Sequence, residues 1–240
     1  MGKMKSMRCI TQRDLDSYLK SDKIAFLLNK YSKPGDEIFA SQRWLLDSAP
    51  KRMLFEDLYG DLLTDGQKSY RILDVGGGVT GLTRMLAKHH DYHLLDIFAH
   101  DHQEALEGLR SEVGRGFWTN GDWYEHMPDM AFDIIIANDL FPNVDQRLRL
   151  FLDKALEKCR EIRLSLTFYN NARYYLTQRI GAEEILCFLA FDGEQTAAVL
   201  SRFQDRIERP DFESLMDMSR PSLYSNGRQV AIAYLRGMGE

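Results

Sequence analysis

An acidic residue close to a run of glycines is the first part of this sequence whose spacing suggests chemistry. Residues 71–83 are RILDVGGGVTGLT, in which Asp74 precedes Gly76, Gly78 and Gly81. The spacing Gly76-x-Gly78-x-x-Gly81 matches the turn with which many α/β proteins bind a dinucleotide, and Asp96 follows 20 residues after Gly76. One hypothesis is therefore a nicotinamide cofactor, and the other is a cofactor better suited to the charge of Asp74.

Three observations argue against the nicotinamide hypothesis. Asp74 is expected at the carboxyl end of a strand, where its negative charge would repel a pyrophosphate and favour a cationic group. A chain of 240 residues is not expected to hold the further substrate domain of a typical dehydrogenase. The predicted strands also end in an antiparallel hairpin, which does not match two βαβαβ halves.

These residues resemble instead the class I S-adenosylmethionine-dependent methyltransferases. The resemblance extends over about residues 68–168 and depends on four motifs in this order: LDVGGG, HLLDIF, GDW and FDIIIAND. It implies S-adenosylmethionine as the cofactor, which carries an ammonium and a sulfonium but no phosphate. Asp74 would then face a cation, which agrees with its charge.

The resemblance also implies which residues bind the cofactor. Asp96 would hold the ribose hydroxyls, and Asp122 would accept the adenine amine beside the apolar wall of Trp123. Thr80 would donate its hydroxyl to the carboxylate of the cofactor. The full implied set is Asp74, Gly76, Gly78, Thr80, Asp96, Ile97, Asp122, Trp123 and Asn138.

The sequence departs from the usual pattern of this family in two places. The common turn is D-x-G-x-G-x-G, but here Thr80 takes the place of the third glycine and Gly81 follows one residue later. Many relatives that act on small metabolites have D-x-L-E-H after the fourth strand, where this chain has DLFPN. Because Pro142 and Asn143 replace Glu and His, no catalytic histidine is implied at this position.

The candidate catalytic residues follow predicted strands two, four and five. A methyl transfer to a hydroxyl is helped by a group that accepts its proton, and Asp139 is the first candidate for that group. His100 and His102 come next, followed by Tyr169.

The candidate substrate contacts are Asn143, Asn170 and Arg173. Arg173, or alternatively Arg179, would meet an anionic group of the substrate. The stretch LTFYNNARYYLTQR at 166–179 is equally compatible with an ordinary polar loop. No metal is expected, because the asparagines after strand five are weak ligands for a hard cation.

The hypothesis that these motifs favour is an enzyme that methylates a small molecule, at a hydroxyl of a sugar or secondary metabolite. Two alternatives stay open, which are methylation of a small amine and a non-catalytic protein that uses the same fold for binding. A nicotinamide oxidoreductase is disfavoured for the reasons above.

Composition limits the partners of the protein. The formal net charge of −5 and the pI of about 5.7 argue against a nucleic-acid substrate. The three cysteines are far apart and form no C-x-x-C, which favours a reducing, cytoplasmic setting. The longest apolar runs are too short to span a bilayer. A homodimer is left open.

The elements that must position these residues follow an α/β pattern. Residues 1–66 are predicted to form a helical cap or lid, and residues 67–240 are predicted to form the methyltransferase domain. In the second region strands alternate with helices, which indicates a doubly wound, seven-stranded, mostly parallel sheet with an antiparallel seventh strand.

The part of the chain after residue 170 gives a weaker pattern. It predicts helices around 182–191, 193–207 and 211–218, the second capped by Asp192. Asn226-Gly227 between two strand-like runs predicts a closing hairpin, in which strands six and seven would be antiparallel to each other.

Overall fold

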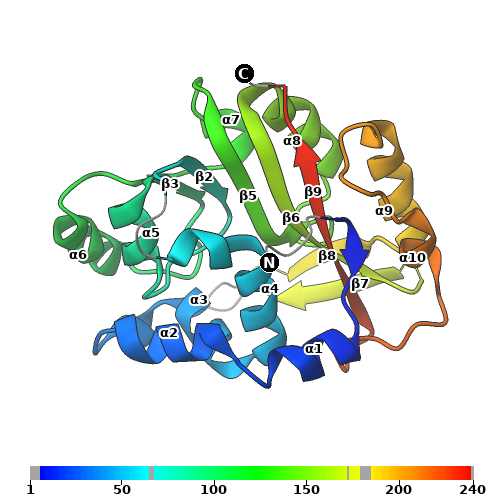
Figure 1. Ribbon diagram of the computed structural model, residues 1–240, viewed down its shortest axis with the longest axis horizontal. Helices are drawn as coiled ribbons and strands as arrows, with labels where there is room; N and C mark the ends of the chain where they lie inside the picture. The colour runs from blue at the N-terminus through cyan, green and yellow to red at the C-terminus, as the bar shows by residue number, and fades with distance from the viewer. Residues whose placement is uncertain (1–5, 65–67, 172, 179–184, 239–240) are drawn as a thin grey trace.

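The computed structural model describes residues 6–64, 68–171, 173–178 and 185–238, and its centre is a seven-stranded sheet (Figure 1). The strand order is β1-β9-β6-β5-β2-β3-β4. The five strands from β6 to β4 are parallel, whereas β9 is antiparallel to both of its neighbours. The strands of this sheet are β1 (Arg8–Cys9), β2 (Arg71–Val75), β3 (Asp91–Asp96), β4 (Trp118–Asn120), β5 (Phe132–Phe141), β6 (Cys159–Tyr169) and β9 (Arg228–Arg236).

Helices cover both faces of this sheet, and the expected doubly wound α/β fold with an antiparallel last strand is confirmed. The helices are α1 (Gln12–Tyr18), α2 (Lys23–Tyr31), α3 (Ala40–Asp47), α4 (Ala49–Tyr59), α5 (Thr83–His89), α6 (Gln103–Val113), α7 (Trp123–His126), α8 (Leu148–Ala155), α9 (Gly193–Leu200) and α10 (Phe212–Met216). Short 3-10 turns lie at Asp36–Ile38, Gly60–Leu63, Leu156–Lys158 and Ser201–Phe203.

The continuous apolar strands explain why both faces are covered. Along a strand successive side chains point to opposite faces, so a strand that is apolar throughout needs helices on each side. Ile72, Ile134 and Ile136 pack in one hydrophobic cluster with α4, α5 and α6. Leu73 and Ile135 pack in a second cluster with α7, α8 and α9.

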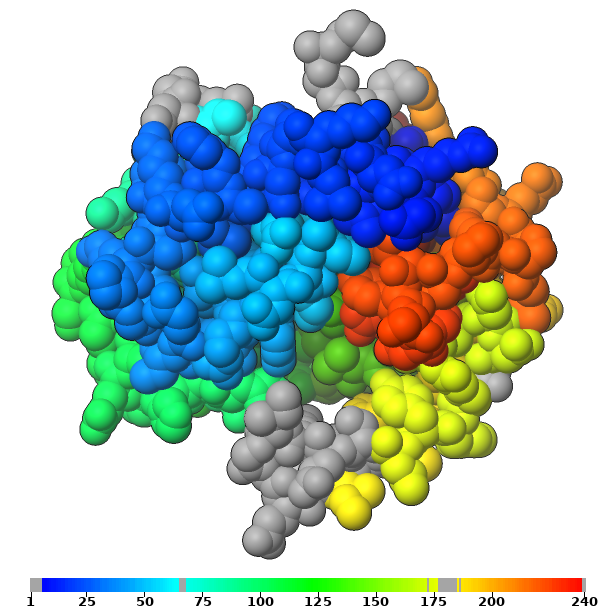
Figure 2. All heavy atoms as spheres, turned by 90° about the horizontal axis from the view of Figure 1, so that it is seen from below, coloured from blue at the N-terminus to red at the C-terminus, as the bar shows by residue number. Residues whose placement is uncertain are grey.

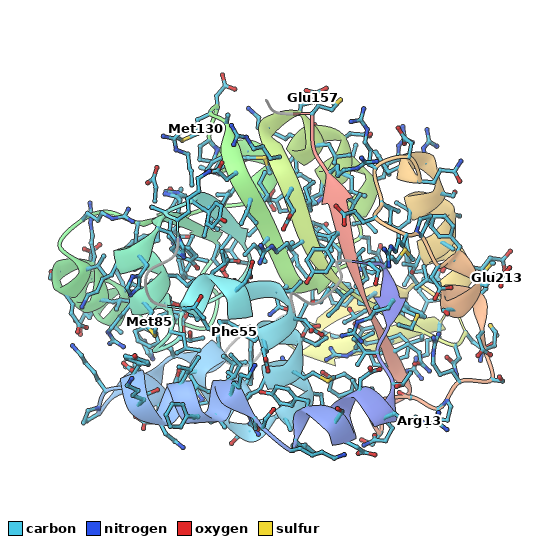
Figure 3. The ribbon with its side chains drawn as sticks, viewed as in Figure 1. Arg13, Phe55, Met85, Met130, Glu157 and Glu213 are labelled. Atoms are coloured by element: carbon cyan, nitrogen blue, oxygen red, sulfur yellow. The ribbon has the colours of Figure 1, made fainter. Side chains whose placement is uncertain are left out.

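The N-terminal cap, which we define as α1 to α4, lies across the carboxyl ends of the parallel strands. In Figure 1 these helices run along the lower part of the view, and β5 and β6 descend towards them. Thr11 starts α1 with a capping box, and the Ser48 side chain accepts a hydrogen bond at the start of α4. Phe55 of α4, labelled in Figure 3, stacks on Tyr59 and belongs to the core shared by the cap and the sheet.

The strand before the cap belongs to the main sheet. β1 pairs with β9, with Arg8 opposite Ile232 and Cys9 opposite Ala231. The seventh strand of the sheet therefore comes from the beginning of the described chain, ahead of the cap. The predicted domain boundary at residues 66 and 67 falls outside the described residues.

Two predictions for the C-terminal part are wrong. Ile185–Ala190, expected within a helix, is strand β8, which pairs with β7 (Arg173–Gln178) in a separate two-stranded sheet. Residues 182–184 of that expected helix lie outside the described residues. A short apolar run is compatible with either structure, and here cross-strand pairing decided it.

The closing hairpin at Asn226-Gly227 is also absent. Gly227 has φ = +85°, but Asn226 does not have a positive φ, and its Oδ1 atom accepts from the Arg228 backbone N–H, so the two-residue hairpin turn does not form. The residues before it form no strand, and the Ser222 hydroxyl donates to the carbonyls of Tyr224 and Arg228. β9 pairs with β6 and β1 instead.

Asp192 caps α9 with a capping box, as predicted. The helix expected at 211–218 is α10, which is shorter than predicted. In the described part of the chain, no helix combines the length and the apolar character needed to cross a membrane.

Candidate active site

A cavity of about 770 Å³ lies at the carboxyl ends of the parallel strands, beneath α3 and α4. Its walls come from the turn after β2, the loops after β3, β4 and β5, the start of β9 and strand β8. Seen from below in Figure 2, the cap, the segment before β9 and the β7–β8 sheet border a recess in the surface. In open α/β sheets ligands bind at this edge.

The glycine turn after β2 forms one wall of this cavity. Gly76 and Gly78 have φ of +69° and +65°, which favours glycine over residues with a side chain. A Cβ atom on Gly78 would lie 1.9 Å from Ser41 Oγ of α3. The turn therefore needs glycine both for its backbone conformation and for the close approach of the cap.

Gly81, the glycine that follows one residue later than in the common turn, and Thr80 both form hydrogen bonds within the protein. The Gly81 N–H donates to Gln42 Oε1 of the cap at 2.9 Å, and a Cβ atom there would lie 2.8 Å from Ser32 Oγ. Thr80 lines the cavity, but its hydroxyl accepts from the Leu82 N–H. The glycine has shifted by one residue to the position where the cap touches the turn.

Asp74 does not line the cavity. It is 2% exposed and lies beneath the glycine turn, where its two oxygens accept hydrogen bonds from Tyr59 at 3.0 Å and from Tyr92 at 2.7 Å. Burial raises the pKa of Asp74 to about 7, although both tyrosine hydrogen bonds oppose the shift. This position contradicts the expected direct contact with a cofactor, since Gly77 separates the carboxyl from the cavity.

Asp96 ends β3 and lines the cavity. Its Oδ2 accepts from the Gly78 N–H at 3.0 Å and its Oδ1 accepts from the Phe98 N–H at 2.8 Å. Burial raises the pKa of this carboxyl. The following side chain, Ile97, is 47% exposed within the cavity wall and offers an apolar surface to a ligand.

Asp122 and Trp123 line the cavity after β4. Arg147 donates to both oxygens of Asp122, at 3.1 and 2.6 Å, and this hydrogen bonding lowers the pKa of the carboxyl. The Trp123 indole donates to Asp145 at 2.7 Å, and the Arg147 guanidinium lies 4.8 Å from the ring centre. Asp122 keeps further lone pairs, so its predicted contact with an adenine amine stays a prediction.

Asn138 and Asp139 enter the cavity from a bulge in β5. The register with β6 shifts between Ala137 and Phe141, and Asp139 has φ = +57°. Ser165 of β6 holds the bulge, because its hydroxyl donates to Asn138 and accepts from the Asp139 N–H, both at 2.7 Å. Bulges commonly redirect a side chain beside a functional site.

The Asp139 carboxylate lies between two cations. Lys51 Nζ of α4 is 3.2 Å from its Oδ2, and a guanidinium nitrogen of Arg228 is 3.6 Å from its Oδ1. That Oδ1 is buried and has no hydrogen-bond partner among the described residues.

One of the two candidate histidines reaches the cavity. His100 lines it, packs edge-on against Trp44 at 5.8 Å, and has a buried Nδ1 without a hydrogen-bond partner among the described residues. His102 is exposed at the start of α6 and lies outside the cavity wall. Within the described ranges, no group of three His, Cys, Asp or Glu side chains is placed to hold a metal ion.

Four other predicted site residues lie outside the cavity wall. Asn143 is buried, where it donates to the Thr167 carbonyl and accepts from the Phe191 N–H. Asn170 accepts from Gln229 at 2.9 Å. Arg173 lies over the Tyr169 ring, 4.0 Å from its centre, and donates to a backbone carbonyl. The structure therefore places none of the expected substrate contacts Asn143, Asn170 and Arg173, nor the candidate catalytic residue Tyr169, in the cavity wall, because their polar groups or rings are used in packing.

Comparison with solved structures identifies the fold, whereas no family model and no curated protein matches the sequence. The 1,6-didemethyltoxoflavin-N1-methyltransferase of Burkholderia thailandensis, solved with 1,6-didemethyltoxoflavin and S-adenosylhomocysteine, superposes with a TM-score of 0.51 at 14% identity. The match covers 92% of this chain and 89% of that one. This chain has the fold of the class I S-adenosylmethionine-dependent methyltransferases.

Two further solved structures are similar in fold to this chain. The N-terminal domain of EvdMO1, crystallised in the presence of S-adenosylhomocysteine and D-fucose, has a TM-score of 0.50 at 14% identity and covers 86% of this chain and 84% of its own. The PH0226 protein of Pyrococcus horikoshii has the same TM-score and identity and covers 80% and 93%.

The methyltransferase fold of this chain also brings residues into the cavity that sequence patterns missed. Ser41 and Lys51 come from the cap, Arg147 precedes α8, Phe188 comes from β8, and Arg228 starts β9. No local motif marks these residues, because each reaches the cavity through a long-range contact. For Ser41 the sequence offered one indication, because it begins the aromatic and basic stretch SQRWLLD in the predicted lid.

Proposed function

We propose that this protein is an S-adenosylmethionine-dependent methyltransferase that acts on a small molecule. The observation that carries the proposal is the position of Asp96, whose carboxylate faces the cavity while it holds the Gly78 N–H of the glycine turn. The shared fold and the expected place of a ligand at the carboxyl edge support it.

The charges around the turn also fit this cofactor better than a dinucleotide. The described cavity-lining residues of the turn and of the loop after β3 include Asp96 and Asp101 but no lysine or arginine. Two carboxylates suit ribose hydroxyls and cationic groups, whereas they would repel a pyrophosphate. Asp96, Ile97 and the backbone of Gly76–Gly78 would hold the cofactor, and Asp74 would support the turn from below.

When bound, S-adenosylmethionine supplies an electrophilic methyl group on its sulfonium. The residues of this chain have the tasks of aligning the acceptor and excluding water. Trp44 and Lys51 of the cap cover the cavity on one side. Asp139, displaced into the cavity by the β5 bulge, would accept a hydrogen bond and then the proton from the nucleophile of the acceptor.

The acceptor atom we propose is a hydroxyl oxygen, with a small amine as the alternative. The buried Asp139 Oδ1, which has no hydrogen-bond partner among the described residues, favours a nucleophile that carries a hydrogen atom. A setting in the cytoplasm is part of the proposal, in agreement with free thiols at Cys9, Cys159 and Cys187.

Thermal unfolding with added ligands tests the cofactor. S-adenosylhomocysteine should raise the melting temperature in proportion to its affinity, and NAD should not. Asp96→Asn should weaken the response to S-adenosylhomocysteine on the order of tenfold or more, because a charge-assisted contact is lost. Asp91→Asn, at the exposed opposite end of β3, is the matched control. Stabilisation by NAD alone would overturn the proposal.

Turnover tests the proposed proton acceptor. On hydroxyl acceptors from a metabolite panel, Asp139→Asn should lower kcat by about 10²- to 10⁴-fold, the usual contribution of a general base. Binding of S-adenosylhomocysteine should change little. Full activity of this variant would exclude Asp139 as the base, and absence of turnover by the wild type on every acceptor would favour the non-catalytic alternative.

A further inference from the structure

Two cations stand on the side of the cavity away from the glycine turn. The strand order places β2, β3 and β4 on one side of the cavity, with Asp96 and Asp122 at their ends. β5 and β9 lie on the other side, where Asp139 and Arg228 line the cavity together with Lys51 of the cap. If the first side holds the cofactor, the second side is left for the acceptor.

Arg228 is held rigidly at the edge of the cavity. Its backbone is fixed on both sides, since its N–H donates to Asn226 and its carbonyl accepts from Ser222. Its guanidinium lies 4.5 Å from the centre of the Tyr224 ring. The side chain is 20% exposed, so it is mostly withdrawn from bulk water.

Lys51 approaches the same point from α4. Its Nζ lies 3.2 Å from Asp139 and 4.7 Å from the centre of the Trp44 ring. In the described part of the chain, Asp139 is the one carboxylate within ion-pair distance of either Lys51 or Arg228. Among the described residues, two positive charges therefore share one negative charge.

The Asp139 carboxylate keeps an unused hydrogen-bond acceptor between these two cations. Asp139 Oδ1 is buried and has no hydrogen-bond partner among the described residues, and a guanidinium nitrogen of Arg228 lies 3.6 Å from it. Buried polar atoms are nearly always paired in folded proteins, so this acceptor beside a cavity favours a ligand that donates a hydrogen bond. Lys51 and Arg228 are donors that line the cavity beside this acceptor, so the three side chains suit a ligand that both accepts and donates hydrogen bonds.

Arg147 and Arg173 are less suited to hold a ligand. Arg147 already binds the carboxylates of Asp122 and Asp145. Arg173, which the sequence suggested for this task, lies outside the cavity wall. Of the described cations that line the cavity, Arg228 and Lys51 remain, with the Asp139 carboxylate between them.

We propose that the acceptor carries an acidic group, a carboxylate or a phosphate, that Arg228 and Lys51 bind. The hydroxyl or amine that receives the methyl group would then donate its hydrogen bond to Asp139. This inference rests on the proposed methyltransferase function, and it narrows the acceptor to small hydroxy or amino acids and phosphorylated hydroxy compounds. Guanidinium groups suit both anions, because their planar donors match the oxygens.

The test measures anion binding to protein saturated with S-adenosylhomocysteine. Lactate, salicylate and inorganic phosphate are each compared with chloride at equal ionic strength, by thermal unfolding. Lactamide and salicylamide serve as neutral counterparts of the two hydroxy acids. At least one anion should raise the melting temperature, and the amides should not. A rise in melting temperature with lactate or salicylate but not with phosphate indicates a site for a carboxylate, and the reverse result indicates a site for a phosphate.

Substitutions test whether Arg228 and Lys51 bind the anion. Arg228→Gln and Lys51→Gln should each weaken anion binding on the order of 10- to 100-fold, because a charge-assisted hydrogen bond is lost. Arg228→Lys should retain part of the response. Arg149→Gln, at an exposed arginine of α8 paired with Asp153, is the matched control and should bind as the wild type does.

The outcomes separate the two proposals. No response to S-adenosylhomocysteine would contradict the proposed function itself. If S-adenosylhomocysteine stabilises the protein but none of the three anions does, the proposal of an acidic acceptor is overturned and the proposed function is not. The same holds if Arg228→Gln and Lys51→Gln bind the anions as the wild type does.

Discussion

Asp74 has the most perturbed environment of the predicted site carboxyls. It is fully enclosed by Tyr59, Tyr92 and the glycine turn, and its pKa of about 7 lies well above the usual value of 3.8. The folded protein therefore keeps a proton on Asp74 up to about neutral pH, whereas the unfolded chain loses it near pH 4. Unfolding between these values releases a proton, so rising pH favours the unfolded state.

Asp74→Asn should reduce this pH dependence. The wild type should lose up to about 4 kcal/mol of its unfolding free energy, relative to the variant, as the pH rises from 4 to 7. Urea denaturation of both proteins at pH 4 to 8 measures the difference. The pKa values of Asp96 and Asp101 are also raised, and both residues are present in each protein, so the comparison isolates Asp74 together with its charge coupling to Asp96. Parallel curves for the two proteins would contradict this description of Asp74.

At the scale of single residues, motif spacing predicted which strand ends carry polar groups. Asp96, Asp122, Asn138 and Asp139 all reach the cavity, as expected from their place after strands two, three and four of the predicted sheet. Spacing does not predict which way a side chain turns. Asp74 is also at a strand end, yet its side chain lies beneath the turn, where it accepts hydrogen bonds from Tyr59 and Tyr92.

At the scale of elements, α3 is the part of the cap that touches the glycine turn. The Gln42 side chain, 1% exposed, accepts from the Gly81 N–H and donates to Ser32. The first N–H of α3, on Ala40, donates to Asp101 in the loop after β3 at 3.1 Å. The cap therefore helps to fix two loops that border the cavity.

Gln42→Ala should destabilise the protein by about 1–3 kcal/mol, because it leaves the buried Gly81 N–H without an acceptor. Chemical denaturation measures this loss. Gln12→Ala, which removes an exposed side-chain hydrogen bond to Asp16, should change stability by about 0.5 kcal/mol or less. Equal effects of the two variants would show that Gln42 does not secure the cap.

The elements with strong periodicity or clear caps were predictable, and those made by distant pairing were not. The cap helices and the parallel strands β2 to β6 follow from apolar patterns and from caps such as Thr11. Strand β8 and the missing hairpin before β9 were predicted wrongly. Both outcomes depend on which distant strands pair with each other in the folded protein, and a local sequence pattern does not specify that pairing.

At the scale of the whole molecule, β1 closes the edge of the sheet beside β9. The Ile10 side chain is fully buried, and its N–H donates to the Val230 carbonyl at 2.8 Å. Without β1, the buried and apolar strand β9 would present an open edge, which is a site for aggregation. The segment before the cap therefore has a structural task in the methyltransferase fold.

Deletion of residues 1–10 should lower the melting temperature and increase light scattering on heating, because β9 loses its outer partner. Deletion of residues 1–5 alone, which leaves β1 in place, is the control and should behave as the full chain does. If both deletions unfold at the temperature of the full chain without scattering, the assignment of β1 as the edge strand is contradicted.

The central claim is that the cavity under the cap binds S-adenosylmethionine with its ribose at Asp96. A crystal structure of the protein with S-adenosylhomocysteine tests it most directly. We predict electron density with the ribose hydroxyls within hydrogen-bond distance of the Asp96 carboxylate and the amino-acid part against Gly76–Gly78. A complex in which the ribose lies away from Asp96, or a cavity without S-adenosylhomocysteine at saturating concentration, would contradict the claim.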